Sequence, residues 1–194
     1  MDVCGDAEDA ETAWIQIKKT VPDFIIVDLL LKNSNGIDLI KDIKKLWNDI
    51  PILVISMLDE MQYAERAFAA GASGYIMKHE ASGAIVDAIR TMMTGKRYMS
   101  EEITSVFVDR AINRGSSNKM SGVESLTDRE LEIFRLIGSG FTTGKIAVRL
   151  RINVKTVGTY RERIKQKLGI KSSASLVREA MRWTSEFSTN GFGP

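Results

Sequence analysis

The 194-residue chain has almost none of the side chains that bind structural metals or form disulfides. It contains one cysteine, Cys4, and one histidine, His79. A lone cysteine cannot form an internal disulfide, and one cysteine with one histidine cannot make a Cys/His zinc site. A Gly-rich phosphate loop and a nucleophile–base pair are also missing, which disfavours an α/β enzyme fused to a basic helical domain.

Long apolar runs are missing as well. No run approaches the roughly 20 residues that are needed to cross a bilayer. The first ten residues are acidic rather than basic, so no signal peptide is visible. We therefore expect a cytoplasmic protein with no membrane partner.

Charge divides the chain into two parts. The net charge is +2, but residues 126–183 hold 13 Lys/Arg against 5 Asp/Glu, whereas residues 1–125 hold 14 against 19. A basic module binds polyanions because each neutralised phosphate releases condensed counterions. The second part therefore has the charge of a nucleic-acid-binding domain.

The first part alternates apolar runs with segments of helical periodicity. The runs "DFIIVDLLL", "IPILVISML" and "GYIM" are typical of parallel strands that are covered on both faces. Helical spacing lies between and after them, at 36–47, 61–70 and 81–94, as in a doubly wound α/β domain. Ligands of such domains bind at the carboxyl ends of the strands. Those ends hold Asp28, Ser56 and Lys78.

The second part has the pattern of a helix-turn-helix. Thr127 and Glu130 form a capping-box pattern before an apolar helix. A short helix, a turn and a longer basic helix follow. We predict an α/β domain at 1–96, a linker at 97–125, an all-α domain of four helices at 126–183 and a disordered tail at 184–194.

The basic helix, "KTVGTYRERIKQKLGI", has one apolar face and one polar face. Val157, Tyr160, Ile164 and Leu168 fall on the core side at the 3.6-residue period, with Val154 and Arg161 at its edge. The polar face supplies candidate contacts to base edges, which are Lys155, Thr159 and Glu162. Candidate phosphate contacts are Thr156, Arg163, Lys165 and Lys167.

The last helix is rich in apolar side chains, namely Leu176, Val177, Ala180, Met181 and Trp183. Two interpretations stay open. These side chains either pack on the preceding helices or form a dimer surface.

Two sets of motifs resemble known families. The segment "LTDRELEIFRLIGSGFTTGKIAVRLRINVKTVGTYRERIKQKLGI" closely resembles the four-helix DNA-binding domain of LuxR-type regulators. The segments "VDLLLKNSNG", "VISM" and "AAGASGYIMK", in that order, resemble the flavodoxin-like receiver domain of two-component response regulators. Together they imply a response regulator of the NarL/FixJ class, which controls transcription.

The resemblance implies a role for each strand-end residue. Asp28 matches the phosphate-accepting aspartate, Ser56 the hydroxyl that senses the phosphoryl group, and Lys78 the lysine that pairs with it. Tyr75 matches the aromatic residue that reports the signal to the outer face. The implied partners are a sensor histidine kinase and double-stranded DNA, bound as a homodimer on an inverted repeat, and the implied cofactor is Mg²⁺.

The chain departs from the receiver pattern at its start. The family has a first strand and helix ahead of Met1, and that strand supplies an acidic pair that holds magnesium; here "MDVCGDA" already resembles the second strand. Asp6 and Asp9 match the wrong strand, and we expect Asp9 to cap a helix. Asp28 and the Leu30 carbonyl alone are a poor Mg²⁺ site. Phosphorylation at Asp28 is therefore expected to be impaired.

One alternative function comes from a different class. The protein could be a phospho-signalling protein, or a pseudo-receiver, whose helical module mediates protein interaction rather than specific DNA binding. Selection of DNA fragments from a random pool separates the two.

Overall fold

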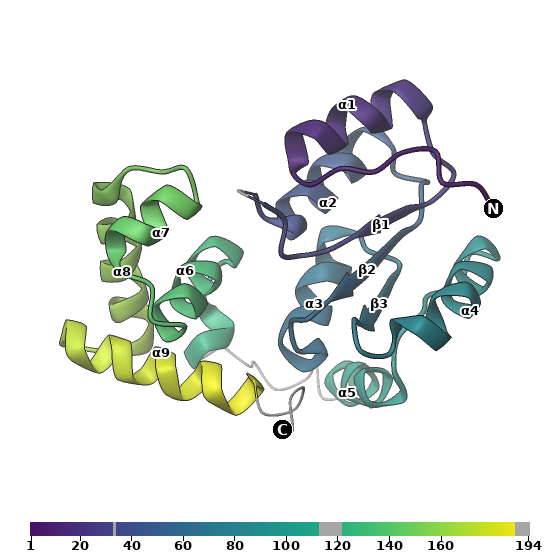
Figure 1. The fold of residues 1–194 in the computed structure, drawn as a ribbon. Coiled ribbons are helices and arrows are strands. Elements are labelled where there is room, and N and C mark those ends of the chain that lie inside the picture. The colour runs from purple at the N-terminus through teal and green to yellow at the C-terminus, as the bar shows by residue number, and fades with distance from the viewer. Residues whose placement is uncertain (33, 113–121, 189–194) are drawn as a thin grey trace. The chain divides into compact units, whose positions relative to one another are not determined.

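The computed structural model describes residues 1–32, 34–112 and 122–188, and the chain divides into two units, Met1–Asn113 and Arg114–Pro194. The first unit is α/β and the second is all helical, as the sequence predicts (Figure 1). None of the described helices is both long enough and apolar enough to span a membrane. The elements, in chain order, are α1 (Ala10–Thr20), β1 (Ile25–Val27), α2 (Gly36–Leu46), β2 (Ile52–Ser56), α3 (Glu60–Ala70), β3 (Gly74–Met77), α4 (Ala81–Met93), α5 (Glu101–Ile112), the 3₁₀ turn η1 (Gly122–Ser125), α6 (Asp128–Gly138), α7 (Thr143–Arg149), α8 (Val154–Leu168) and α9 (Ser173–Ser188).

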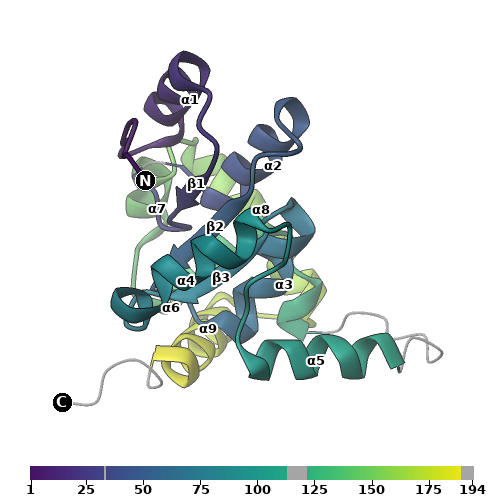
Figure 2. The same ribbon diagram turned by 90° about the vertical axis from the view of Figure 1, so that its right-hand side faces the viewer.

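A parallel sheet forms the centre of the first unit. Its three strands lie in chain order, β1-β2-β3, and every residue of the middle strand β2 is buried. A strand buried on both faces must be apolar throughout, which explains the continuous run before Ser56. Helices α2 and α3 lie on one face of the sheet and α4 lies on the other (Figure 2).

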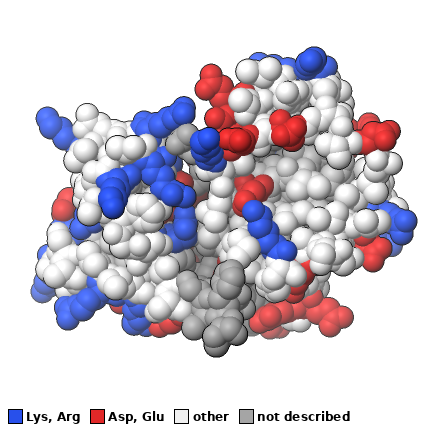
Figure 3. All heavy atoms as spheres, in the orientation of Figure 1, with Lys and Arg blue, Asp and Glu red and all other residues white. Residues whose placement is uncertain are grey.

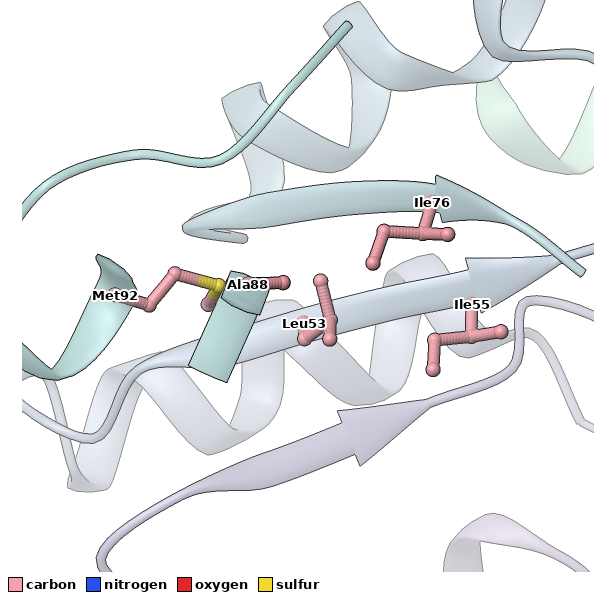
Figure 4. Close-up of a cluster of buried hydrophobic side chains, with 5 residues drawn as sticks. All are labelled: Leu53, Ile55, Ile76, Ala88 and Met92. Carbon is pink, nitrogen blue, oxygen red and sulfur yellow. The ribbon is translucent and has the colours of Figure 1, made fainter. Parts of the chain in front are cut away.

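A small apolar core fixes α4 on its face of the sheet (Figure 4). It consists of Leu53, Ile55, Ile76, Ala88 and Met92. Leu53 and Ile55 are two positions apart on β2 and share a face, and Ala88 and Met92 are four apart on α4 and share a side. Full burial of a Leu or Ile side chain stabilises a fold by about 1.5–3 kcal/mol. This cluster therefore holds the helix that follows Lys78.

Strand β1 has one neighbour in the described sheet, and Ile26 in its centre is 48% exposed. The sequence prediction of a strand at "MDVCGDA" is wrong, because these residues form neither strand nor helix. To form an edge strand of the sheet, residues 1–7 would need a neighbouring strand to which their backbone N–H and C=O groups could hydrogen-bond. The family's first strand would lie between them and β1, and none of the described segments takes that place.

Helix α5 lies in the segment predicted to be a linker. The chain first returns to β3 at Tyr98, whose carbonyl accepts from Tyr75 N at 3.0 Å and whose N–H donates to the Ser73 carbonyl at 3.0 Å. Phe107 of α5 then packs edge-on against Phe68 of α3, with ring centroids 5.7 Å apart. Residues 97–112 are thus part of the first unit, and 113–121 lie outside the described residues.

Helix α6 of the second unit begins with the predicted capping box. Thr127 Oγ1 accepts from Glu130 N at 3.4 Å, and Glu130 Oε2 accepts from Thr127 N at 2.8 Å. Asn153 caps α8 by accepting from Lys155 N at 2.8 Å, and Gly169 ends that helix in the left-handed conformation. The order is therefore the one that the sequence predicts: helix α6, the short helix α7, a turn and the basic helix α8.

Helix α9 packs on the preceding helices. Leu176, Ala180 and Trp183 are buried, and the Trp183 ring lies 5.8 Å from that of Phe134 on α6. Met181, at 53% exposed, is the member of the apolar set that faces solvent. The structure thus favours internal packing over a dimer surface. The helix continues to Ser188, into the segment predicted as a tail, and 189–194 lie outside the described residues.

Candidate functional site

Asp28 directly follows β1, and its carboxylate lies at the carboxyl edge of the sheet. Oδ2 is 2.8 Å from Lys78 Nζ, while Oδ1 accepts from Leu30 N at 2.9 Å and from Ser56 Oγ at 3.3 Å. The side chain is 26% exposed. The structure thus brings together the three predicted strand-end residues around a carboxylate that solvent can reach.

A hydrogen-bond chain leads inward from this carboxylate. Ser56 is fully buried, and its Oγ also accepts from Leu58 N at 3.2 Å. The Leu58 carbonyl accepts from the Tyr75 hydroxyl at 2.7 Å. Burial raises the pKa of Tyr75 well above its usual value, so this phenol stays neutral and remains a donor. Tyr75 therefore lies inside the unit, connected to Asp28 through Ser56 and Leu58.

The loop after Asp28 can close only because residue 36 is glycine. A Cβ at Gly36 would lie 2.5 Å from the Asp28 carbonyl oxygen and 2.6 Å from Leu29 Cα. Gly36 N donates to the Leu29 carbonyl at 3.2 Å, and Asn35 caps α2 through Ile37 N at 2.8 Å. The start of α2 is thereby held against the backbone that carries the Asp28 carboxylate.

The described residues do not fit a magnesium site. In the ranges 1–32, 34–112 and 122–188, no group of three or more His, Cys, Asp or Glu side chains is placed to hold a metal. Asp6 is exposed ahead of α1, and Asp9 caps that helix by accepting from Thr12 N at 2.9 Å, as predicted. Asp28 would contribute a single carboxylate beside its own backbone, whereas Mg²⁺ requires a near-ideal octahedral shell.

Helix α8 presents a polar face to solvent. Of the predicted core side, Val157 and Ile164 are fully buried, and Tyr160 and Leu168 are partly buried. The exposed residues are Val154, Lys155, Thr156, Thr159, Glu162, Arg163, Gln166 and Lys167. Val154, the first residue of the helix and predicted at the edge of the core side, is 53% exposed.

Lys167 holds two helices together. Its Nζ lies 2.6 Å from Glu130 Oε2 and 3.1 Å from the Ser125 carbonyl, and Glu130 is 3% exposed. Burial alone would raise the pKa of Glu130, but the hydrogen bonds from Lys167 and Thr127 outweigh it and lower that pKa. The amine predicted to contact phosphate therefore ties the end of α8 to the start of α6.

Lys165 is also engaged within the unit. Its side chain is 14% exposed, and its Nζ lies 2.9 Å from Glu162 Oε2. Arg163 extends past the Tyr160 ring, with its guanidinium carbon 6.0 Å from the centroid, and remains exposed. Sequence reasoning identified these cations but missed their partners. Glu162 could have been found from its i,i+3 spacing, whereas Glu130 lies 37 residues from Lys167 and leaves no local signal.

The two units differ in the charge of their surfaces. In Figure 3, Lys and Arg are spread over the helical unit, whereas Asp and Glu predominate on the α/β unit. This distribution agrees with the excess of Lys/Arg in residues 126–183. A basic surface around an exposed helix is the electrostatic arrangement that favours a polyanion.

Comparison with known proteins settles the family. Residues 1–90 match the response regulator receiver domain, and residues 124–180 match the bacterial regulatory proteins of the luxR family. The oxygen regulatory protein NreC of Staphylococcus epidermidis RP62A is 30% identical over 187 residues, which cover 94% of this chain and 86% of NreC. The chain belongs to the LuxR-type response regulators.

Solved structures agree with this LuxR-type fold. One structure of the response regulator RcsB of Salmonella typhimurium matches with a TM-score of 0.66 at 22% identity, and covers 93% of this chain and 84% of RcsB. Another, RcsB bound to promoter rprA in the presence of phosphomimetic BeF₃⁻, matches with a TM-score of 0.60 at 22% identity, over 93% and 85%. At this identity the likeness concerns the fold. As a LuxR-type response regulator, the protein is a DNA-binding regulator of transcription in a two-component system.

Proposed function

We propose that Asp28 accepts a phosphoryl group from a sensor histidine kinase and that this modification controls DNA binding by the second unit. The observation that carries the proposal is the pair of contacts to its carboxylate, from Lys78 Nζ at 2.8 Å and from Ser56 Oγ at 3.3 Å. A cation and a hydroxyl so placed stabilise the negative charge that a phosphoryl group adds. Tyr75, linked to Ser56 through Leu58, is positioned to respond when that hydroxyl changes partner.

In the second unit, α8 enters the major groove of double-stranded DNA. Lys155, Thr159 and Glu162 face the base edges, since they lie on the exposed side opposite Val157. Phosphate contacts come from the flanking Thr156 and Arg163, whereas the amines of Lys165 and Lys167, also predicted to contact phosphates, already contact glutamates. Two chains bind an inverted repeat as a homodimer, with half-sites about 34 Å apart.

Residues 1–194 by themselves accept the phosphoryl group slowly or not at all. When acetyl phosphate is the donor, an Asp28 oxygen attacks phosphorus, the bond from phosphorus to the acetyl oxygen breaks, and acetate departs. Negative charge gathers on the phosphoryl oxygens at that moment. Lys78 is the cation beside Asp28. The described residues offer no set of acidic side chains that could hold a metal ion as a second cation.

Intact-mass measurement tests this proposal. The chain and an Asp28→Ala variant are incubated with acetyl phosphate and Mg²⁺, and a version extended at its N-terminus by a segment with two acids serves as the positive control. We expect labelling of the extended protein and little of the 194 residues. Rapid, stoichiometric addition of one phosphoryl group to the 194 residues, lost in Asp28→Ala, would contradict the slow acceptance, and labelling that persists in Asp28→Ala would contradict Asp28 as the acceptor.

The salt dependence of DNA binding tests the role of the second unit. We expect the affinity of the full chain for duplex DNA to fall with salt, with a log–log slope of roughly −0.9 for each phosphate neutralised. Lys155→Ala should reduce affinity or change sequence preference more than Arg178→Ala, because Arg178 is an exposed cation on α9. An affinity that does not change with salt would instead support a protein-interaction role for the helical unit.

A further inference from the structure

Glu162 is an unusual side chain for a surface that binds DNA. Its side chain is 64% exposed on the polar side of α8, and it is the only acidic residue in a helix that also carries five Lys and Arg residues. A carboxylate beside the phosphates of a duplex is repelled by them. It is tolerated there when it accepts a hydrogen bond, and the major groove offers amino donors on cytosine N4 and adenine N6.

Lys165 holds this carboxylate in place. Its side chain is only 14% exposed, so its stem lies along the protein, and its Nζ is 2.9 Å from Glu162 Oε2. An ordinary surface pair orders two mobile side chains and contributes little to stability. Here one partner is already packed, so the ion pair costs less entropy and restricts where the carboxylate can point. The cation also offsets part of the repulsion between Glu162 and the phosphates.

The residues one turn earlier allow close approach to the bases. A Cβ at Gly158 would meet no atom within 4 Å, so the surface there is flat and open. The Thr159 hydroxyl donates to the Lys155 carbonyl at 3.2 Å. Because this donor is used inside the helix, Thr159 offers DNA a methyl group and an acceptor. Among Gly158, Thr159 and Glu162, the group suited to accept a hydrogen bond from a base amine is therefore the Glu162 carboxylate. Cytosine suits it better than adenine, because adenine carries its amine beside the N7 acceptor, which repels a carboxylate.

We propose that Glu162 recognises a cytosine in each half-site by accepting a hydrogen bond from its N4 amine, and that Lys165 is the residue that positions it. The proposal rests on the DNA-binding function of α8 and names the base that this function selects. It assigns Lys165 to holding Glu162 rather than to a phosphate.

Selection of duplexes from a random pool by the full chain provides the test. We expect wild type to enrich one C·G pair per half-site, with a preference of roughly 5- to 150-fold over other bases. Glu162→Gln should move that preference toward adenine, because glutamine pairs with adenine N6 and N7, and Glu162→Ala should abolish it. Glu179→Gln, an acid on α9, is the matched control and should leave the selected sequence unchanged.

Lys165→Met separates positioning from phosphate contact. A positioning residue loses preference at the cytosine position alone, whereas a phosphate contact weakens binding to all sequences and reduces the salt slope by about 0.9. Uniform weakening would overturn the role of Lys165, and an unchanged selected sequence in Glu162→Gln would overturn the role of Glu162. Failure of wild type to enrich any sequence would overturn both this inference and the proposed function. A selected sequence that Glu162→Gln leaves unchanged would overturn this inference alone, so the two failures are distinguishable.

Discussion

Replacement of Lys167 by methionine should destabilise the helical unit. The change keeps most of the aliphatic stem and removes the amine that contacts Glu130 at 2.6 Å and the Ser125 carbonyl at 3.1 Å. Removal of one partner from a fully buried ion pair costs about 3–5 kcal/mol. The Lys167 side chain is 35% exposed, so we expect a smaller loss of about 2–3 kcal/mol in the free energy of unfolding.

The loss should depend on pH in a defined direction. In wild type the pKa of Glu130 is below its usual 4.5, so the pair stabilises the fold above about that pH, and this stabilisation is lost as the pH falls through the lowered pKa. Without the amine, burial raises the pKa of Glu130, and a protonated carboxyl is tolerated. The difference between the two proteins therefore shrinks toward acid pH, by about 1.4 kcal/mol for each unit separating the two pKa values.

Urea unfolding followed by tryptophan fluorescence measures this effect. The full chain has three tryptophans, and replacement of Trp14 and Trp47 by phenylalanine leaves Trp183, which contacts Phe134 within the helical unit, as the reporter. Lys155→Met is the control, since that exposed side chain lies on the same helix. An equal loss for both lysine variants, or a loss at Lys167 that does not change between neutral and about pH 4.5, would refute the reasoning.

Two further predictions concern close packing at glycines, and thermal unfolding measures both. Gly36→Ala should destabilise the α/β unit by about 1–3 kcal/mol, because the added Cβ meets the Asp28 carbonyl oxygen at 2.5 Å. Gly138→Ala should destabilise the helical unit by a similar amount, because its Cβ meets the Ala180 carbonyl of α9. Gly83→Ala, in an open position of α4, is the control and should be neutral or stabilising by up to about 1 kcal/mol. Equal stability of the three variants would contradict both predictions.

Much of the architecture is determined by local patterns in the sequence. The run "ILVIS" predicts β2 because a strand buried on both faces must be apolar throughout. Thr127 and Glu130 predict the start of α6 because both capping bonds join groups three residues apart. The meeting of Asp28 with Ser56 and Lys78 was also predictable, since parallel strands end at one edge of a sheet.

Only the tertiary structure decided which side chains are committed to packing. The sequence presents Lys167 as one more cation on a polar helix face, and its partner is Glu130, 37 residues away. It presents 97–112 as a polar linker, yet Tyr98 returns to the edge of β3 and Phe107 meets Phe68. Periodicity records which face of a helix is apolar, but a contact between distant elements depends on how the chain brings them together. That information is spread over the whole fold rather than held in any one segment.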